Sequence, residues 1–282
     1  MQKGTPSSTA AGAAMQRAAH LVIDGEPKIL VDEYALRFLD DRQRGRVIEH
    51  DEVLQAPHVR ASRGHILGRS AFTEDELRRA VADGCRQYVV LGAGYDSSPA
   101  RLANALTDVA VFEVDHPATQ QAKRNVLHDG EWPDNVRFVA VDFERDLLEA
   151  RLRDTGWDAS APTFWSWLGV AMYLSDEAVM NTLRFVASGA AGTSIVVNFT
   201  IHDDEVTPSD LALRRISAQG VAQQGEPWIN FYRPSELVER VRRLPYSSVE
   251  SVAPEVFRSR YFDHRDDGLT WSSLTGLLVA RV

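Results

Sequence analysis

The chain has 282 residues, of which 44% are apolar, 25% charged and 9% aromatic, and its formal net charge is -9. This composition is typical of a folded globular protein, and the acidic balance disfavours nucleic acid as a partner. A single cysteine, Cys85, excludes an intrachain disulfide and a cysteine-based zinc site, and we assign no metal. The first twenty residues hold no sustained hydrophobic stretch and no run of about 18 apolar residues occurs, so we expect a cytoplasmic protein without membrane association.

The N-terminal third is predicted to be helical. Residues 1–17 are small and polar, and we expect a disordered tail there, followed by a helical cap over residues 18–85. A first helix is predicted in KILVDEYALRFL, directly after Pro27, because its apolar residues recur at a spacing of four. A second helix is predicted to begin at a capping box that opens with Thr73 and to end at Gly84.

Residues 86–282 alternate between short apolar runs and amphipathic helical patterns, with no Pro/Gly/Ser linker and no internal repeat. Buried strands are predicted at 87–91, 110–114, 136–141, 163–170, 194–200 and 274–282. This order predicts a single α/β domain with a doubly wound, mostly parallel sheet. The long connection 201–233 contains a helical stretch, and we expect it to form an inserted lid.

The turn after the first strand is glycine-rich. It reads Gly92-Ala93-Gly94-Tyr95-Asp96-Ser97, so a ligand can approach bare backbone beside a helix N-terminus. The sixth position is Ser97 rather than Gly or Ala, which departs from the dinucleotide fingerprint. A structural turn without a ligand remains the alternative.

Acidic residues follow the next two strands. Glu113 and Asp115 lie about twenty residues after the glycine turn, where a carboxylate can accept hydrogen bonds from a ribose diol. Asp142 ends the third strand, where it could reach an adenine amino group or, alternatively, cap a helix. The combination predicts a nucleoside ligand.

Several linked motifs carry a resemblance to a known family. They are RQYVVLGAGYDSSPARL, VFEVDHPATQQAKR, VAVDFERD, AAHLVIDGEPKILVDEYALRFL, LGRSAFTEDELRRAV, WLGVAMYLSDEAV and GEPWINFYRPSELVERV. From about residue 18 onward the chain resembles the leucine carboxyl methyltransferase family, especially its bacterial small-molecule branch. The resemblance implies a Rossmann-like class I methyltransferase that uses S-adenosylmethionine, with the N-terminal helices as a cap over the cofactor.

The resemblance also implies roles for single residues. Gly92, Ala93 and Gly94 would lie against the methionine and ribose, and Asp115 would hold the ribose hydroxyls, with Glu113 beside it. Asp142 and Phe143 match the family's Asp-Leu pair around adenine. Arg69 in GRSAF matches an arginine that grips the methionine carboxylate, with Arg63 as the competing candidate. The family often has a glutamate at the fourth strand, where this chain has Leu168.

The methyl acceptor is expected to be a small metabolite or a peptide C-terminus. Aromatic residues around the fourth strand and before Pro234 could wall its pocket, and we select Trp167, Tyr173, Trp228 and Tyr232. A carboxylate acceptor needs no base, whereas a hydroxyl acceptor does. None of the histidines considered, His65, His116, His202 and His264, is assigned as catalytic. The oligomeric state is left open.

Oxygen methylation is therefore the function that we predict from the sequence. Three rivals are a protein carboxyl methyltransferase, a nicotinamide-dependent oxidoreductase and a non-catalytic nucleoside-binding module. The oxidoreductase would share the sheet and the ribose acid but should have Gly or Ala at position 97.

Overall fold

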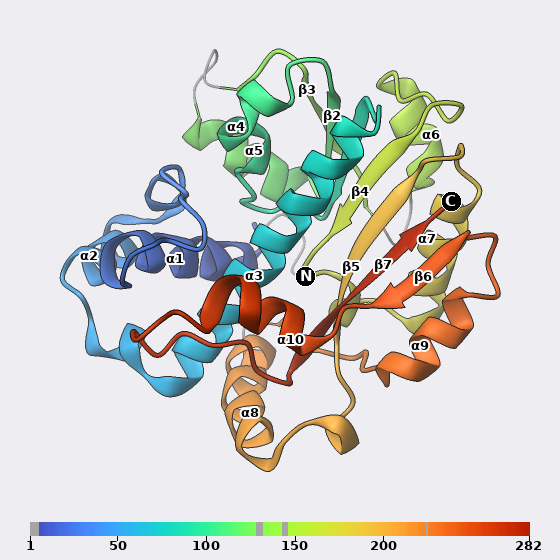
Figure 1. Ribbon diagram of the computed structural model, residues 1–282. Helices are drawn as coiled ribbons and strands as arrows, with labels where there is room; N and C mark the ends of the chain where they lie inside the picture. The colour runs from blue at the N-terminus through green and yellow to red at the C-terminus, as the bar shows by residue number, and fades with distance from the viewer. Residues whose placement is uncertain (1–5, 128–131, 143–145, 224) are drawn as a thin grey trace.

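A computed structural model describes residues 6–127, 132–142, 146–223 and 225–282 (Figure 1). Its centre is a seven-stranded sheet in the order β3-β2-β1-β4-β5-β7-β6. The strands are β1 (Gln87–Leu91), β2 (Ala110–Asp115), β3 (Val136–Ala140), β4 (Thr163–Trp167), β5 (Ser194–Thr200), β6 (Ser248–Ser251) and β7 (Thr275–Arg281). β1 to β5 are parallel, and β7 lies antiparallel between β5 and β6. The sheet is therefore doubly wound and mostly parallel, as predicted.

The helices of the described residues surround this sheet. They are α1 (Ser8–Ile23), α2 (Asp41–Ile48), α3 (Pro57–Ala82), α4 (Ser98–Arg101), α5 (Pro117–Val126), α6 (Leu148–Asp154), α7 (Asp176–Ala187), α8 (Pro208–Gln223), α9 (Pro234–Val241) and α10 (Pro254–Phe257). In Figure 1, α3 runs between the sheet and the N-terminal helices α1 and α2, and it contacts α1, α8, β4 and β5. None of these helices is long and apolar enough to cross a membrane.

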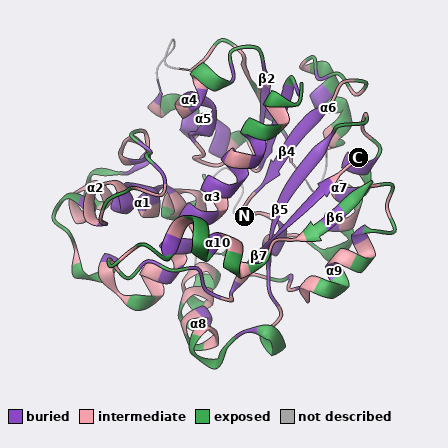
Figure 2. Cartoon of the chain, viewed as in Figure 1, coloured by how far each residue is buried: buried purple, intermediate pink, exposed green. Residues whose placement is uncertain are grey.

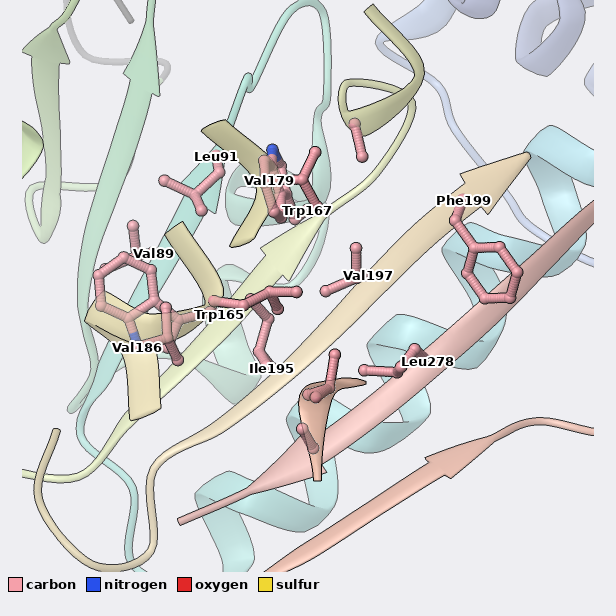
Figure 3. Close-up of a cluster of buried hydrophobic side chains, with 14 of the residues drawn as sticks. Val89, Leu91, Trp165, Trp167, Val179, Val186, Ile195, Val197, Phe199 and Leu278 are labelled. Carbon is pink, nitrogen blue, oxygen red and sulfur yellow. The ribbon is translucent and has the colours of Figure 1, made fainter. Parts of the chain in front are cut away.

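The core lies on both faces of the sheet. One cluster joins inward side chains of β1, β4 and β5 to α6, α7 and α9, and Figure 3 shows Trp165, Trp167 and Ile195 within it. A second cluster joins the alternate strand residues to α3 and α10. Because both faces are covered, the central strands are buried along their whole length, whereas the edge strand β6 is partly exposed (Figure 2). This short edge strand was not predicted from the sequence.

The expected N-terminal tail is corrected by the structure. Residues 1–5 lie outside the described part, but α1 begins at Ser8, and the Ser7 hydroxyl caps it by accepting from the Ala10 amide at 3.2 Å. Ala14 and Ala18 of this helix are fully buried. Alanine favours helices and its small side chain permits close packing, so a segment without large apolar residues still folds.

The expected helix after Pro27 is also wrong, since only Ala35–Phe38 form a single 3-10 turn. The buried Asp32 carboxylate organises this segment instead, because it accepts from Arg17 Nε at 2.7 Å and from the Tyr34 amide at 3.1 Å. Long-range ion pairing thus overrides the local apolar spacing.

The predicted capping box at Thr73 does not exist, because α3 continues through this position from Pro57. The Thr73 hydroxyl donates to the Arg69 carbonyl one turn earlier, at 2.8 Å. The predicted end of the helix is confirmed: α3 ends at Ala82, and Gly84 follows with a φ of 101°. A serine or threonine that bonds to the preceding turn fits a helix interior as well as a cap.

Candidate functional site

A cavity of about 940 Å³ opens at the carboxyl ends of the parallel strands. The strand order reverses between β1 and β4, which is where an open α/β sheet leaves a crevice for a ligand. The walls come from the turn after β1, the ends of β2, β4 and β5, the helices α1, α3 and α8, and the loop that contains Trp228.

The glycine turn after β1 forms part of the cavity wall. Gly92 and Gly94 both have positive φ, 66° and 50°, which favours glycine at these positions. A Cβ atom at Gly92 would lie 2.3 Å from Cγ2 of Val170, and one at Gly94 would lie 3.2 Å from Cβ of Ala10. The turn therefore fits against Val170 and Ala10 because positions 92 and 94 carry no side chain. Ala93 also lines the cavity.

Asp115 lies at the end of β2 and lines the cavity beside this turn. Its carboxylate accepts from the Gly94 amide through Oδ2 and from the His116 amide through Oδ1 at 2.6 Å. Burial raises the pKa of Asp115, and the two backbone hydrogen bonds partly offset this effect. The carboxylate is thus fixed in orientation while its remaining lone pairs are available to a ligand.

Asp142 lines the cavity next to Asp115, because β3 pairs with β2 and the Val141 amide donates to the Asp115 carbonyl at 2.9 Å. The Asp142 amide donates to Oδ2 of Asp146 at 2.8 Å, which holds the chain beyond β3. The expected neighbourhood of the acids is therefore present. Phe143 lies outside the described residues.

Arg69 reaches the cavity from the middle of α3. It donates from Nη1 to Oδ1 of Asn198 at 2.8 Å, while its Nε is buried without a hydrogen-bond partner among the described residues. No carboxylate of the described chain lies within ion-pair distance of this guanidinium. Burial lowers the pKa of Arg69 to about 10, so the group stays cationic at neutral pH. A buried cation with no ion-pair partner among the described residues favours an anionic ligand.

Arg63, the competing arginine, is corrected by the structure. It does not line the cavity, and it donates from Nε and Nη2 to the two carboxylate oxygens of Asp24 at 2.8 and 2.9 Å. A third hydrogen bond joins Nη1 to the Leu54 carbonyl at 2.9 Å. With its donors used in this way, Arg63 ties α3 to the segments around it.

Glu113 is also placed away from the cavity wall. It lies two residues before Asp115 but is 1% exposed, and its Oε2 accepts from Lys123 Nζ at 2.7 Å. Burial raises the pKa of Glu113 to about 7, against the opposing effect of Lys123. Glu113 therefore belongs to a buried ion pair between β2 and α5 rather than to the ligand site.

The four aromatic residues expected at the acceptor pocket divide into two pairs. Tyr173 and Trp228 line the cavity, and the Trp228 Nε1 donates to the Tyr173 hydroxyl at 3.3 Å. Trp167 and Tyr232 do not, which corrects their assignment. Trp167 is fully buried in the core, and the Tyr232 hydroxyl donates to Asp176 Oδ1 at 3.0 Å. Adjacent strand residues point to opposite faces, so proximity in sequence did not separate these roles.

Leu168 occupies the cavity wall just after β4, where the resemblance led us to look for a glutamate. Ser166 also lines the cavity, and its hydroxyl forms a hydrogen bond with the Tyr88 hydroxyl at 3.0 Å. The cavity wall after β4 thus has an apolar side chain, Leu168, at the position where a glutamate was expected.

Several cavity residues were missed from the sequence. Those on α1, α8 and the sheet ends include Thr9, Ala10, Arg17, Thr200, Arg214, Ser217 and Thr275. No local motif marks them, because they reach the cavity only through tertiary packing. His58, His65 and His116 also line it, while His202 and His264 do not. Among the described residues, no group of three His, Cys, Asp or Glu could hold a metal ion.

Comparison with known proteins gives a consistent picture. The family model described as leucine carboxyl methyltransferase matches residues 10–187. YktD of Bacillus subtilis, named as a candidate S-adenosyl-L-methionine-dependent methyltransferase, is 30% identical over 209 residues, which cover 72% of this chain and 68% of that protein. A protein of Mycobacterium sp. strain KMS with the same description is 29% identical over 197 residues, 69% of this chain and 76% of that protein.

Solved structures share the fold. A candidate methyltransferase of Thermobifida fusca aligns with a TM-score of 0.61 at 17% identity and covers 99% of this chain and 96% of its own. A DUF574 family protein of Streptomyces avermitilis aligns with a TM-score of 0.57 at 18% identity and covers 94% of this chain and 96% of its own. At these identities the likeness concerns the fold alone.

Proposed function

The chain belongs to the leucine carboxyl methyltransferase family, and from that membership we propose that it transfers a methyl group from S-adenosylmethionine to an oxygen atom of a small acceptor. The chain is an S-adenosylmethionine-dependent methyltransferase, as its relatives are. The nicotinamide-dependent oxidoreductase and the non-catalytic nucleoside-binding module are therefore set aside. Two points are our proposal: the methylated atom is an oxygen of a carboxylate or a hydroxyl, and the acceptor is a small molecule.

One observation above all supports the cofactor site: the buried Arg69 guanidinium faces the cavity without a carboxylate partner in the described chain. The cofactor carries a carboxylate at its methionine end, and a guanidinium can bind it through two parallel hydrogen bonds. Asp115 and Asp142 would take the ribose hydroxyls and the adenine amino group. The glycine turn leaves room where a Cβ atom would meet Val170 or Ala10. The residues present therefore fit this cofactor.

When bound, S-adenosylmethionine supplies an electrophilic methyl group on a sulfonium. The chain's part is then to align the acceptor and to exclude water, because an in-line displacement needs orientation more than a covalent residue. α1 and the loop with Trp228 line the side of the cavity opposite the sheet, and the Ser7 hydroxyl lies 3.4 Å from Glu226 of that loop. This hydrogen bond connects the residue that caps α1 to the loop that contains Trp228.

The buried cavity histidine His65 is poorly suited to act as a base. Burial lowers the pKa of His65 to about 4, and its Nε2 shares a hydrogen bond of 2.6 Å with the Ser272 hydroxyl. A base so weak and already bonded removes a proton from a hydroxyl poorly at neutral pH. A carboxylate is ionised without help, so we rank carboxylate acceptors first.

The cofactor proposal is tested by calorimetry with two ligands. S-adenosylhomocysteine carries the amino-acid carboxylate, whereas 5′-methylthioadenosine lacks it. We expect Arg69→Gln to weaken S-adenosylhomocysteine binding at least tenfold and to leave 5′-methylthioadenosine unchanged. Arg78→Gln is the matched control, since Arg78 lies on the same helix with its side chain 48% exposed and paired with Asp75. Equal losses for both ligands would exclude Arg69 as the carboxylate partner.

The oxygen-methylation proposal is tested with methyl-labelled S-adenosylmethionine and a panel of small carboxylic acids and phenols. A methyl ester releases labelled methanol in mild alkali, whereas a methyl ether retains the label. We expect alkali-labile label in the small acids and none in protein tails added as competing acceptors. Label confined to a protein tail would assign the enzyme to the protein carboxyl methyltransferases.

A further inference from the structure

The cavity extends past Arg69 to the ends of β5 and β7. Thr200 and Thr275 are register partners there, and both line the cavity. They share a sheet face with Asn198, the partner of Arg69, because side chains alternate along β5. Each of the two threonine hydroxyls is buried without a hydrogen-bond partner among the described residues.

Arg214 of α8 lies against the same place. Its Nη2 donates to the Leu274 carbonyl at 3.2 Å, and that carbonyl also accepts from the Ile201 amide at 3.1 Å. Leu274 and Ile201 are the chain neighbours of Thr275 and Thr200. Arg214 is 4% exposed, and its Nε is buried without a partner in the described part of the chain. It is the only buried residue of α8.

The charge of Arg214 is only partly compensated. Its Nη1 donates to Asp203, but the Asp203 side chain is 57% exposed, so water competes for that carboxylate. Asp210 also attracts the guanidinium, but its Oδ2 accepts from the amide and the hydroxyl of Ser273. An unsatisfied buried polar group destabilises a fold, and three of them belong to residues that line this cavity. Apolar side chains of similar size would avoid this cost, which favours a role in binding over a role in folding.

The surrounding wall is apolar. Residues of α3, α8, the loop with Trp228 and the start of β7 contribute Ile66, Val221, Ile229 and Leu274, together with Met172 after β4. A ligand that fits both this apolar wall and the polar groups of Arg214, Thr200 and Thr275 has an apolar body and one anionic group. Arg214, Thr200 and Thr275 each present a hydrogen-bond donor without a partner among the described residues, and such donors match the lone pairs of a carboxylate.

We propose that Arg214, Thr200 and Thr275 form an anion subsite that anchors a carboxylate of an otherwise apolar acceptor. This subsite is separate from the Arg69 position assigned to the cofactor carboxylate, and it rests on the proposed function because it treats this end of the cavity as the acceptor side. It makes the three residues determinants of acceptor specificity.

The test compares benzoate with benzamide, which have the same size and differ in charge. Calorimetry is done with protein saturated with S-adenosylhomocysteine, so that Arg69 is already occupied. We expect benzoate to bind at least tenfold more tightly than benzamide. In Thr200→Val/Thr275→Val this preference should fall to less than threefold, while the melting temperature without ligand is unchanged or higher, because no hydrogen bond of the free protein is lost.

Thr182→Val is the matched control, since the Thr182 hydroxyl donates to the Ala178 carbonyl within α7, away from the cavity. It should keep the full preference for benzoate. Arg214→Gln should lose the preference as the threonine variant does. Equal affinity for the two probes, no binding of either, or a preference that survives in the threonine variant would each overturn the subsite.

A second titration distinguishes failure of the cofactor proposal from failure of the subsite. If S-adenosylhomocysteine does not bind, the titration is repeated without it in Arg69→Gln, where the same benzoate preference is expected from the subsite alone. Loss of the preference there overturns the subsite independently of the cofactor.

Discussion

Arg69 on α3 and Asn198 on β5 are joined by a hydrogen bond of 2.8 Å from Nη1 to Oδ1. An amide orients the guanidinium but, being neutral, does not balance its charge. A carboxylate at position 198 would have closed the cation into an ion pair and removed its attraction for a ligand. The neutral partner thus keeps the cation both fixed and available.

Asp115→Ala is expected to weaken S-adenosylhomocysteine binding tenfold or more. Hydrogen bonds to a charged group contribute about 1.5 to 3 kcal/mol each, and tenfold corresponds to about 1.4 kcal/mol. Calorimetry measures the affinity, and Asp108→Ala, an exposed position just before β2, is the control. An unchanged affinity with the fold intact would remove Asp115 from the site.

Gly94→Val is expected to abolish cofactor binding and leave the circular dichroism spectrum largely intact. The new side chain is strained at a φ of 50° and crowds Ala10 of α1. Gly84→Val is the matched control, because Gly84 also has positive φ, 101°, but no atom lies within 4 Å of its Cβ position. Both variants should lose stability in thermal melts. If Gly94→Val still binds S-adenosylhomocysteine, the turn is structural only.

The Glu113–Lys123 pair is expected to make stability depend on pH. The pKa of Glu113 is raised to about 7, so the folded state holds a proton that the unfolded chain has released above about pH 4.5. The free energy of unfolding should therefore fall as pH rises from about 4.5 to 7. Urea unfolding should show a smaller fall in Glu113→Gln/Lys123→Met, which removes both charges together. Equal slopes for the two proteins would contradict the raised pKa.

The chemical step is expected to depend little on pH between about 6 and 9. A carboxylate acceptor with a pKa near 4 is ionised throughout, and His65, with its pKa lowered to about 4, does not titrate in this range. Single-turnover rates at saturating cofactor measure this dependence. A sigmoidal rise that disappears in His58→Gln or His116→Gln, the other histidines of the cavity wall, would move the enzyme to the hydroxyl-methylating class.

Local pattern was sufficient for the sheet and for part of the cavity wall. The apolar runs that became β1 and β5 end where they were predicted to end, β2 ends one residue later, and parallel strands place their carboxyl ends at one edge. The glycine turn, Asp115 and Asp142 therefore came together as expected. Glu113 did not, since a spacing of two residues cannot tell a ligand-facing carboxylate from one that a lysine of α5 neutralises.

By itself, then, the sequence determined the class of fold, a doubly wound and mostly parallel sheet. It also determined the glycine turn and the acidic residues at the strand ends. Each of these features depends on residues close together in the chain. Only the tertiary structure decided which arginine stays without a counterion, since the partners of Arg63 and Arg69 lie 39 and 129 residues away. It also decided that α1 lines the cavity and that Arg214, Thr200 and Thr275 line it together. Burial and charge compensation arise from contacts between distant segments, and no local spacing encodes them.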